Sequence, residues 1–278
     1  MLNKKLIGAC ALAALFAPLL LRSAAPAAAG DDAYGYGGTG LTSVGVGGVA
    51  AIRPKYEGSN EYEVYGFPVI YPEFGGGVLS DRLQVRGADD VRYRLLEADG
   101  FELGPLAGYA FGRDEDDGDL LRGLGEVDDG IILGGYVGYR LGPVLFDVSY
   151  HHIVSGDDTG YFLRFGGEIK QPVSSNALVT ARLGTTFADD DYMDSYFGIS
   201  PVQALNSVAG LSRFEASSGI KDVYAELETR IDLTYEWQLR AGARYARLVG
   251  DAADSPIVES ENQFTGYIGA AYRFDVGR

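Results

Sequence analysis

The chain contains almost no cysteine or histidine. Of its 278 residues, one is Cys and two are His. Cys10 lies inside the apolar amino-terminal segment, so removal of that segment would leave no thiol and no disulfide bond. The adjacent His151 and His152 have no thiolates or suitably spaced carboxylate beside them, and they therefore do not match a zinc motif. We expect neither a metal site nor a cofactor.

Apolar runs long enough to cross a bilayer as a helix are missing after residue 29. Before it, Lys4 and Lys5 precede an apolar run and a small-residue stretch, which predicts a cleavable signal peptide over residues 1–29. A retained membrane helix is one alternative. Lipid attachment at Cys10 is another, but a lipobox would follow the apolar run and Cys10 precedes most of it. Residues 30–278 are then one exported domain, either soluble or a β-barrel.

Positive charge is scarce as well. The chain has 23 Lys and Arg against 39 Asp and Glu, for a formal net charge of −16, and removal of the basic leader would make it more acidic. This balance argues against nucleic acid as a partner. The sequence is rich in Gly, Tyr and Phe, with 40, 19 and 13 of each, which suits many twisted strands with aromatic residues at their ends.

The clearest pattern lies between residues 222 and 247, where apolar and charged residues alternate with a period of two. This period is typical of a strand, whereas a helix would repeat every 3.6 residues. In a transmembrane barrel the apolar row would face lipid and the charged row a polar lumen. The odd-numbered apolar positions are Val223, Ala225, Leu227, Thr229, Ile231, Leu233, Tyr235, Trp237, Leu239, Ala241 and Ala243.

The same period-two alternation predicts twelve strands, and the connections between them alternate between short and long. This alternation is typical of an outer-membrane barrel, with short periplasmic turns and long external loops, and is not expected of a soluble sandwich. We therefore predict an all-β, closed, antiparallel transmembrane β-barrel. The predicted strands are 42–53, 62–73, 79–86, 91–97, 101–113, 130–140, 143–153, 160–171, 176–187, 220–233, 235–249 and 263–274.

Charged residues of both signs fall on the predicted lumenal faces. They could form cross-strand salt bridges that fill the interior, or they could line a narrow passage for small anions. The parity favours a largely occluded lumen. The predicted lumenal charges are Arg164, Glu168, Arg182, Glu226, Glu228, Arg230, Asp232, Arg240 and Arg244.

Two features could suggest chemistry, and neither meets its requirements. Ser149 and His151 lie two apart on one strand face, but they point toward the lumen, where no lipid ester would reach them, and no third residue is evident to orient the imidazole. The acidic stretch 114–119 lacks the ligand spacing and closing Glu of an EF-hand, so a solvated external loop is expected. We predict no catalytic residues.

Three segments resemble the MipA/OmpV family, the MltA-interacting proteins of the outer membrane. They are Pro54 to Pro68, Tyr196 to Asp222, and Trp237 to Val258 with Tyr272 to Phe274 at its end, and the run from Gly250 to Val258 is the most specific. The chain departs from the usual barrel ending because four residues follow Phe274. The motif residues are Tyr56, Gly58, Ser59, Tyr62, Pro68, Phe197, Gly198, Trp237, Gly250, Asp251, Asp254, Ser255 and Pro256.

The resemblance implies a twelve-stranded barrel surrounded by outer-membrane lipid and lipopolysaccharide. It also implies a non-enzymatic scaffold that brings a lytic murein transglycosylase together with a penicillin-binding protein. A narrow porin-like channel for small solutes is the alternative. Within the third segment, we expect Asp251, Asp254 and Ser255 to fix a loop through bonds to the backbone, with Pro256 preventing a longer helix. A direct contact with a partner is the other interpretation.

Overall fold

The computed structural model describes residues 41–74, 82–156 and 160–276, and the predicted signal peptide lies outside these ranges. Nearly all of the described chain is antiparallel sheet, joined by loops that carry short helices. The strands are β1 (Leu41–Pro54), β2 (Tyr62–Phe74), β3 (Leu83–Gly87), β4 (Asp90–Tyr93), β5 (Leu96–Ala98), β6 (Phe101–Ala110), β7 (Gly130–Leu141), β8 (Val144–Ile153), β9 (Tyr161–Ser174), β10 (Ala177–Ala188), β11 (Gly219–Asp232), β12 (Trp237–Leu248) and β13 (Asn262–Asp275).

The strands follow one another around a strongly curled sheet. The hydrogen-bonded order is β2-β1-β13-β12-β11-β10-β9-β8-β7-β6-β4-β3, and β5 also pairs with β6. Since β4 pairs with the middle of β6 and β5 with its beginning, β4 and β5 act as one interrupted strand. The predicted all-β architecture of twelve antiparallel strands is therefore confirmed. β2 and β3 are the two ends of this order among the described residues.

The two faces of the sheet carry the side chains that the period-two alternation predicts. Leu227 and Val223 point outward and are 53% and 46% exposed, whereas the side chain of Glu226 between them is only 12% exposed. On β8, Phe146 and Val148 are exposed while Asp147 and Ser149 are buried. A side chain follows the sheet face set by its position, so the apolar surface lies outside and the charges lie inside.

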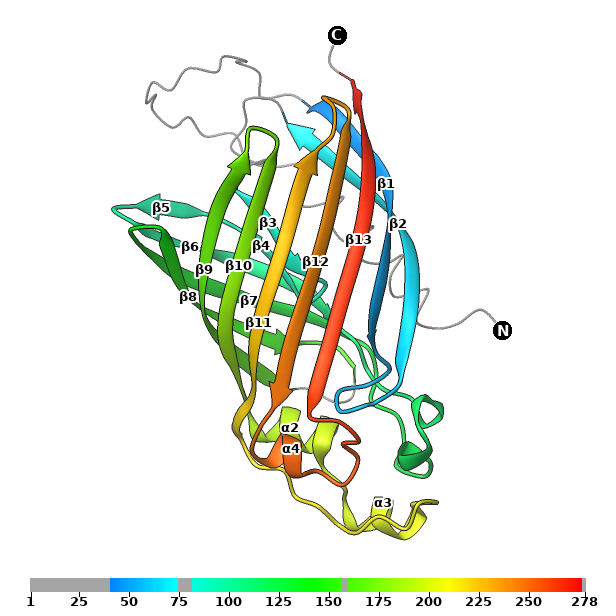
Figure 1. Ribbon diagram of the computed structural model, residues 1–278. Coiled ribbons are helices and arrows are strands. Elements are labelled where there is room, and N and C mark those ends of the chain that lie inside the picture. The colour runs from blue at the N-terminus through cyan, green and yellow to red at the C-terminus, as the bar shows by residue number, and fades with distance from the viewer. Residues whose placement is uncertain (1–40, 75–81, 157–159, 277–278) are drawn as a thin grey trace.

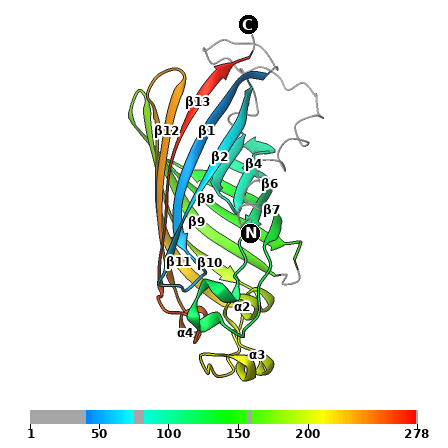
Figure 2. The ribbon, with the colours of Figure 1, turned by 90° about the vertical axis from the view of Figure 1, so that its right-hand side faces the viewer.

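The two ends of the sheet differ in their connections (Figure 1). One end has tight turns, such as the Asp99-Gly100 hairpin, in which both residues have positive φ as a type I′ turn requires. The other end carries the long loops with η2 (Glu115–Asp117), η3 (Asp119–Leu121), α2 (Asp190–Phe197), α3 (Pro201–Asn206) and α4 (Asp251–Asp254). Figure 2, turned by 90°, again places α2, α3 and α4 at the end opposite the carboxyl terminus.

Aromatic side chains gather near both ends of the strands. At the tight-turn end, the rings of Trp237 and Tyr272 lie 5.2 Å apart and those of Tyr272 and Phe274 lie 4.7 Å apart. At the long-loop end, the rings of Tyr245 and Phe264 lie 5.1 Å apart. Such girdles anchor barrels at the two interfaces of a bilayer.

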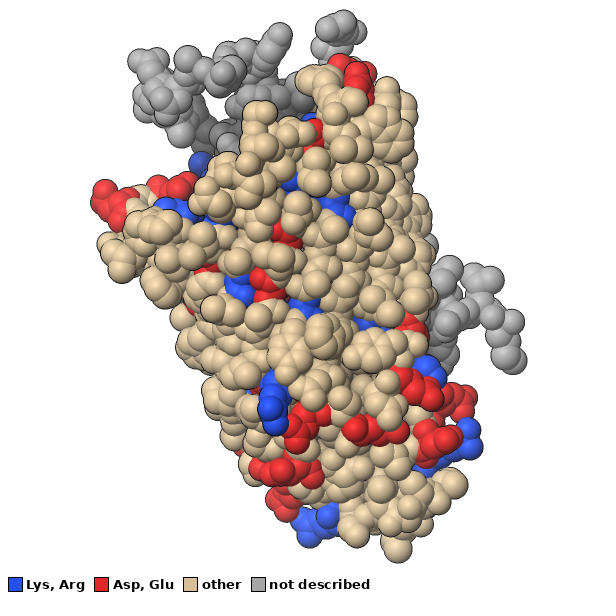
Figure 3. All heavy atoms as spheres, viewed as in Figure 1, with Lys and Arg blue, Asp and Glu red and all other residues tan. Residues whose placement is uncertain are grey.

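The outer surface changes from apolar to charged along the strands. Figure 3 shows acidic and basic side chains gathered over the end that carries the helices, whereas the middle of the sheet is mostly tan with scattered charged atoms. In the described ranges, none of the helices has the length and apolar character needed to cross a bilayer.

Candidate functional site

The lumen is crossed by a continuous series of ion pairs, which we call the ionic chain. It begins on β4, where the guanidinium of Arg92 donates two bonds to the carboxylate of Asp90, at 2.6 and 2.8 Å. Arg92 also bonds to Asp147 of β8, and Asp147 accepts from Arg86 of β3 at 3.1 Å. These side chains are at most 7% exposed, so the ion pairs are removed from bulk water.

The ionic chain continues across three further strands. Arg86 lies 3.2 Å from Glu168 of β9, which accepts from Nε of Arg182 on β10 at 2.7 Å. Arg182 then bonds to Glu226 of β11. Buried charges are tolerated only when they are paired, because removing one partner leaves a desolvated ion. The ionic chain therefore holds β3 and β4 against the wall formed by β8 to β11.

The period-two alternation in the sequence predicted only part of this arrangement. Glu168, Arg182 and Glu226 were predicted to be lumenal, but Arg86, Asp90 and Arg92 were not singled out. β3 and β4 are short, charged and poorly alternating, so period-two reasoning gave no clear face for their side chains. The opposite charges at positions 86 to 92 were the available signal, since buried arginines need carboxylate partners.

Ser149 and His151 are bonded to each other inside the same network. Nδ1 of His151 lies 3.2 Å from the carbonyl oxygen of Asp89, which can only accept, so this nitrogen carries the proton. Nε2 then accepts from the Ser149 hydroxyl at 2.9 Å, while Arg92 donates to the same oxygen at 3.0 Å. The sequence gave no residue that orients the imidazole, and the Asp89 carbonyl does so. Both side chains have 0% exposure, so no substrate can reach them.

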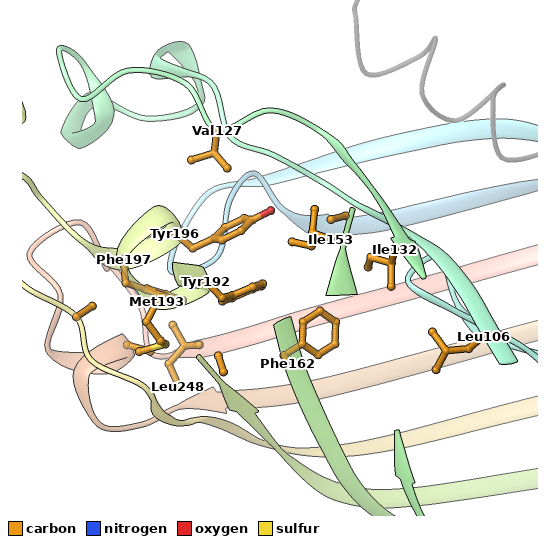
Figure 4. Packing of buried hydrophobic residues seen from close by; sticks show 14 of the residues in the cluster. Leu106, Val127, Ile132, Ile153, Phe162, Tyr192, Met193, Tyr196, Phe197 and Leu248 are labelled. Atoms are coloured by element: carbon orange, nitrogen blue, oxygen red, sulfur yellow. The ribbon is translucent and has the colours of Figure 1, made fainter. Parts of the chain in front are cut away.

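A column of stacked rings rises from His151 toward the long loops. The His151 and Phe162 rings stack 4.5 Å apart, the Phe162 and Tyr192 rings meet edge to face at 5.6 Å, and Tyr192 stacks on Tyr196 at 4.4 Å. Figure 4 shows Phe162, Tyr192 and Tyr196 within the apolar cluster that also contains Met193 and Phe197. We call this cluster, together with the loops over it, the external cap.

The three motif segments, far apart in the sequence, meet in the external cap. Tyr56 donates its hydroxyl hydrogen to the carbonyl of Ile257 at 3.0 Å and packs in a second apolar cluster with Leu121, Leu124, Ile199 and Ile257. The carbonyl of Gly58 accepts from the backbone amides of Glu259 and Ser260, at 2.8 and 2.9 Å. The first motif segment is thus fixed to the third.

The second and third segments are joined by Ser255, whose hydroxyl donates to the carbonyl of Phe197. Asp251 accepts from the amide of Ser217 at 2.8 Å, and Gly250, with φ 58°, precedes α4. Among the described residues, the Asp254 side chain makes no hydrogen bond or ion pair, so it does not fix the loop as expected. The remaining motif residues lie as follows: Ser59 is buried in the first loop, Gly198 follows α2, Pro256 follows Ser255, Tyr62 and Pro68 lie on the outer face of β2, and Trp237 lies in the girdle at the tight-turn end.

The other predicted lumenal charges lie outside the ionic chain. Arg164 bonds to Asp89, and Arg244 lies over the Tyr224 ring at 4.0 Å. Asp232 accepts from Arg273 at 3.0 Å, and Glu228 lies 3.9 Å from Arg182. Arg230 and Arg240 face each other across β11 and β12.

No cation site is evident in the part of the chain that the structure describes. Within it, no group of three or more His, Cys, Asp or Glu side chains is arranged to hold a metal ion. The acidic stretch 114–119 instead forms two turns of 3-10 helix, in which Glu115 accepts from the amides of Gly123 and Gly125 at 3.1 and 2.7 Å.

Comparison with known proteins gives a family match over most of the chain. The model of the family described as MltA-interacting protein MipA matches residues 46–274. Omp26La, an outer membrane protein of Vibrio anguillarum, is 25% identical over 191 residues, covering 66% of this chain and 71% of the relative.

The outer membrane protein OmpV of Vibrio cholerae is 24% identical over 173 residues, covering 61% of this chain and 64% of the relative. The chain therefore spans less than two thirds of the length of that protein. A solved outer membrane channel from Pseudomonas putida F1 is 12% identical, with a TM-score of 0.38, over 84% of this chain and 96% of that chain.

Proposed function

The chain belongs to the family of the MltA-interacting protein MipA, and from this premise we propose that it is a non-enzymatic accessory protein for peptidoglycan enzymes. It lies in the outer membrane, as its relatives do. In this role it would hold a lytic murein transglycosylase and a penicillin-binding protein close together at the inner surface of that membrane. Cutting and synthesis of the polymer would then take place at one location.

The observation that supports this proposal is the packing of side chains across the lumen at two levels. The ionic chain crosses the interior from β4 to β11, and the apolar cluster under α2 fills the outer mouth. A general solute channel needs a continuous polar path, and neither a buried salt-bridge network nor a close-packed apolar cluster supplies one. The geometry therefore favours a protein that acts through its surfaces.

The surface available to periplasmic enzymes is the rim of tight turns. Several apolar side chains stand exposed there: Leu141 is 63%, Leu233 is 54% and Tyr235 is 73% exposed. Exposed aromatic and aliphatic side chains are the usual anchors of protein interfaces. Because these turns are short, we expect each enzyme to contact several neighbouring turns together.

We propose a structural role for the motif residues of the external cap. Tyr56, Gly58 and Ser255 hold the loops together on the side opposite to the periplasmic rim. They would keep the outer mouth closed and would make no contact with the murein enzymes.

The test is site-specific photo-cross-linking in intact cells. A photoreactive residue in place of Tyr235, at the rim, should capture both the transglycosylase and the penicillin-binding protein. The matched control is Leu205 on α3, which is 87% exposed at the external end and should capture neither. Failure to recover either enzyme from several rim positions would refute the scaffold role.

Planar-bilayer recording of the purified barrel tests the rival function. The blocked lumen predicts no stable unitary conductance. Reproducible steps that disappear when Arg240 and Arg244 are replaced by Gln would instead favour a narrow channel for small solutes.

A further inference from the structure

Two arginines, and therefore two positive charges, lie directly opposite each other in the lumen. In the register of β11 and β12, Arg230 pairs with Arg240, and both occupy the inward face that also carries Glu226 and Arg244. Residues so paired have Cβ atoms about 5 Å apart, where like charges repel and destabilise the sheet. Both lie near the tight-turn end, since β11 ends at Asp232 and β12 begins at Trp237.

The carboxylates beside this pair are engaged by other groups. Asp232 accepts from Gln238 at 2.9 Å and from Arg273 at 3.0 Å. Glu228 lies 3.9 Å from Arg182. Within the described ranges, neither Arg230 nor Arg240 has an acidic partner, and the only bond from Arg240 joins its Nε to Gln238 at 2.9 Å.

The row of residues across the neighbouring strands supplies no negative charge either. Leu178 of β10 pairs with Arg230, and Gly269 of β13 pairs with Arg240. Val49 of β1 follows in the same row. The chain has 39 acidic residues against 23 basic ones. A shortage of carboxylates therefore does not explain why these two arginines have no acidic partner.

We propose that Arg230 and Arg240 bind a phosphate group that enters the lumen from the periplasmic end. Two guanidinium forks present parallel N–H donors that match phosphate oxygens, and both side chains remain partly exposed. A phosphate monoester or inorganic phosphate carries between one and two negative charges near neutral pH and so neutralises the pair, whereas a carboxylate neutralises only one guanidinium. The external cap closes the other route.

The chemistry fits inorganic phosphate and the phosphate monoester of a small organic molecule, such as a glycerol phosphate, alike. Isothermal titration of the full-length barrel in detergent, with inorganic phosphate and with glycerol 3-phosphate in separate arms, distinguishes these sources. Tighter binding of glycerol 3-phosphate assigns the site to an organic phosphate monoester, and equal or weaker binding assigns it to free phosphate. Acetate is the comparison anion and should bind at least about tenfold more weakly than the better phosphate.

Arg230→Gln and Arg240→Gln should each weaken phosphate binding by about tenfold or more, because each removes one charged donor. The control is Arg247→Gln, on the same β12 strand at its outer end, where Arg247 is exposed and paired with Glu261 at 2.8 Å. Arg240→Lys, which keeps the charge but loses the fork, should bind with intermediate affinity. Thermal unfolding of every variant shows whether the barrel is intact.

Three results would overturn the proposal. They are no binding of either phosphate by the wild-type barrel, unchanged binding in folded Arg230→Gln and Arg240→Gln barrels, and acetate binding as tightly as phosphate. None of these outcomes bears on enzyme capture at the rim, so this site and the accessory role can fail independently.

Discussion

The hydroxyl of Ser255 donates a hydrogen bond to the carbonyl oxygen of Phe197, which lies 58 positions earlier in the chain. This bond joins the loop after β12 to the end of α2, and both residues are almost fully buried. The external cap therefore depends on a contact between two loops that sheet pairing alone would not bring together.

Ser255→Ala should loosen the external cap without unfolding the barrel. A buried carbonyl left without its donor costs about 1–3 kcal/mol. Hydrogen exchange of residues 190–197 and 251–258 should quicken, while exchange in β9 to β12 stays unchanged. Ser260→Ala is the control, since the Ser260 hydroxyl bonds to Asn262 in an exposed position. Equal exchange in the two variants would show that the Ser255 bond is dispensable.

Gly58→Ala should destabilise the cap through two separate effects. Gly58 has φ +102°, which costs a residue with Cβ about 1–3 kcal/mol, and the new Cβ would lie 2.6 Å from Cγ2 of Val258. Gly125→Ala isolates the first effect, because Gly125 has φ +79° and no atom within 4 Å of the new Cβ. Val258→Ala added to Gly58→Ala should recover part of the loss, as measured by protease resistance of the loops. No recovery would contradict the predicted clash.

Arg92→Leu should destabilise the barrel more than any exposed charge substitution. It leaves Asp90 buried without its arginine, while Asp147 keeps only Arg86, and removing one partner of a buried pair costs about 3–5 kcal/mol. We expect a clear fall in unfolding temperature and a barrel that folds less completely in detergent. Arg213→Gln serves as the control, because its pair with Glu215 is exposed and should contribute less than about 1 kcal/mol. Similar unfolding temperatures would argue that the ionic chain is not structural.

The external cap should weaken at alkaline pH. Burial raises the pKa of the Tyr192 and Tyr196 hydroxyls well above the ordinary value of 10.0. Between about pH 10 and those raised values, the unfolded loop loses protons that the folded loop retains, so stability is full below pH 10 and falls above it. Protease cleavage within residues 189–218 should therefore increase above about pH 10, with the barrel intact.

Tyr192→Phe is the matching variant for the alkaline experiment. It keeps the ring stacked between Phe162 and Tyr196 but cannot ionise, although it loses the hydroxyl bond to Glu57. Its cleavage should depend less steeply on pH than that of the wild type. An identical pH dependence would assign the alkaline loosening to other groups.

The period-two alternation of apolar and polar residues predicted the strands, because each strand has a lipid face and a lumenal face. From β6 onward, the predicted strand beginnings lie within two residues of the observed ones. The predicted strand 79–86 begins outside the described residues, and the predicted strand 91–97 is divided between β4 and β5. The hairpin of β3 and β4 is short, and its buried charges interrupt the alternation of apolar and polar residues that identified the other strands. The helices α2 and α3 were also missed, since residues 188–219 were expected to form a loop. The apolar residues of α2 pack against strand residues distant in the sequence, such as Ile132 and Ile153, and local patterning does not reveal such contacts.

The sequence by itself determined the twelve antiparallel strands and which of their faces is apolar, because alternation is a local property that the extended backbone turns directly into two faces. Only the tertiary structure decided which lumenal charges meet and how the outer mouth is closed. The pairing of Arg92 with Asp147, and of Tyr56 with Ile257, depends on sheet curvature and strand register across separations of 55 and 201 residues. A pattern with a period of two residues carries no information about such distances.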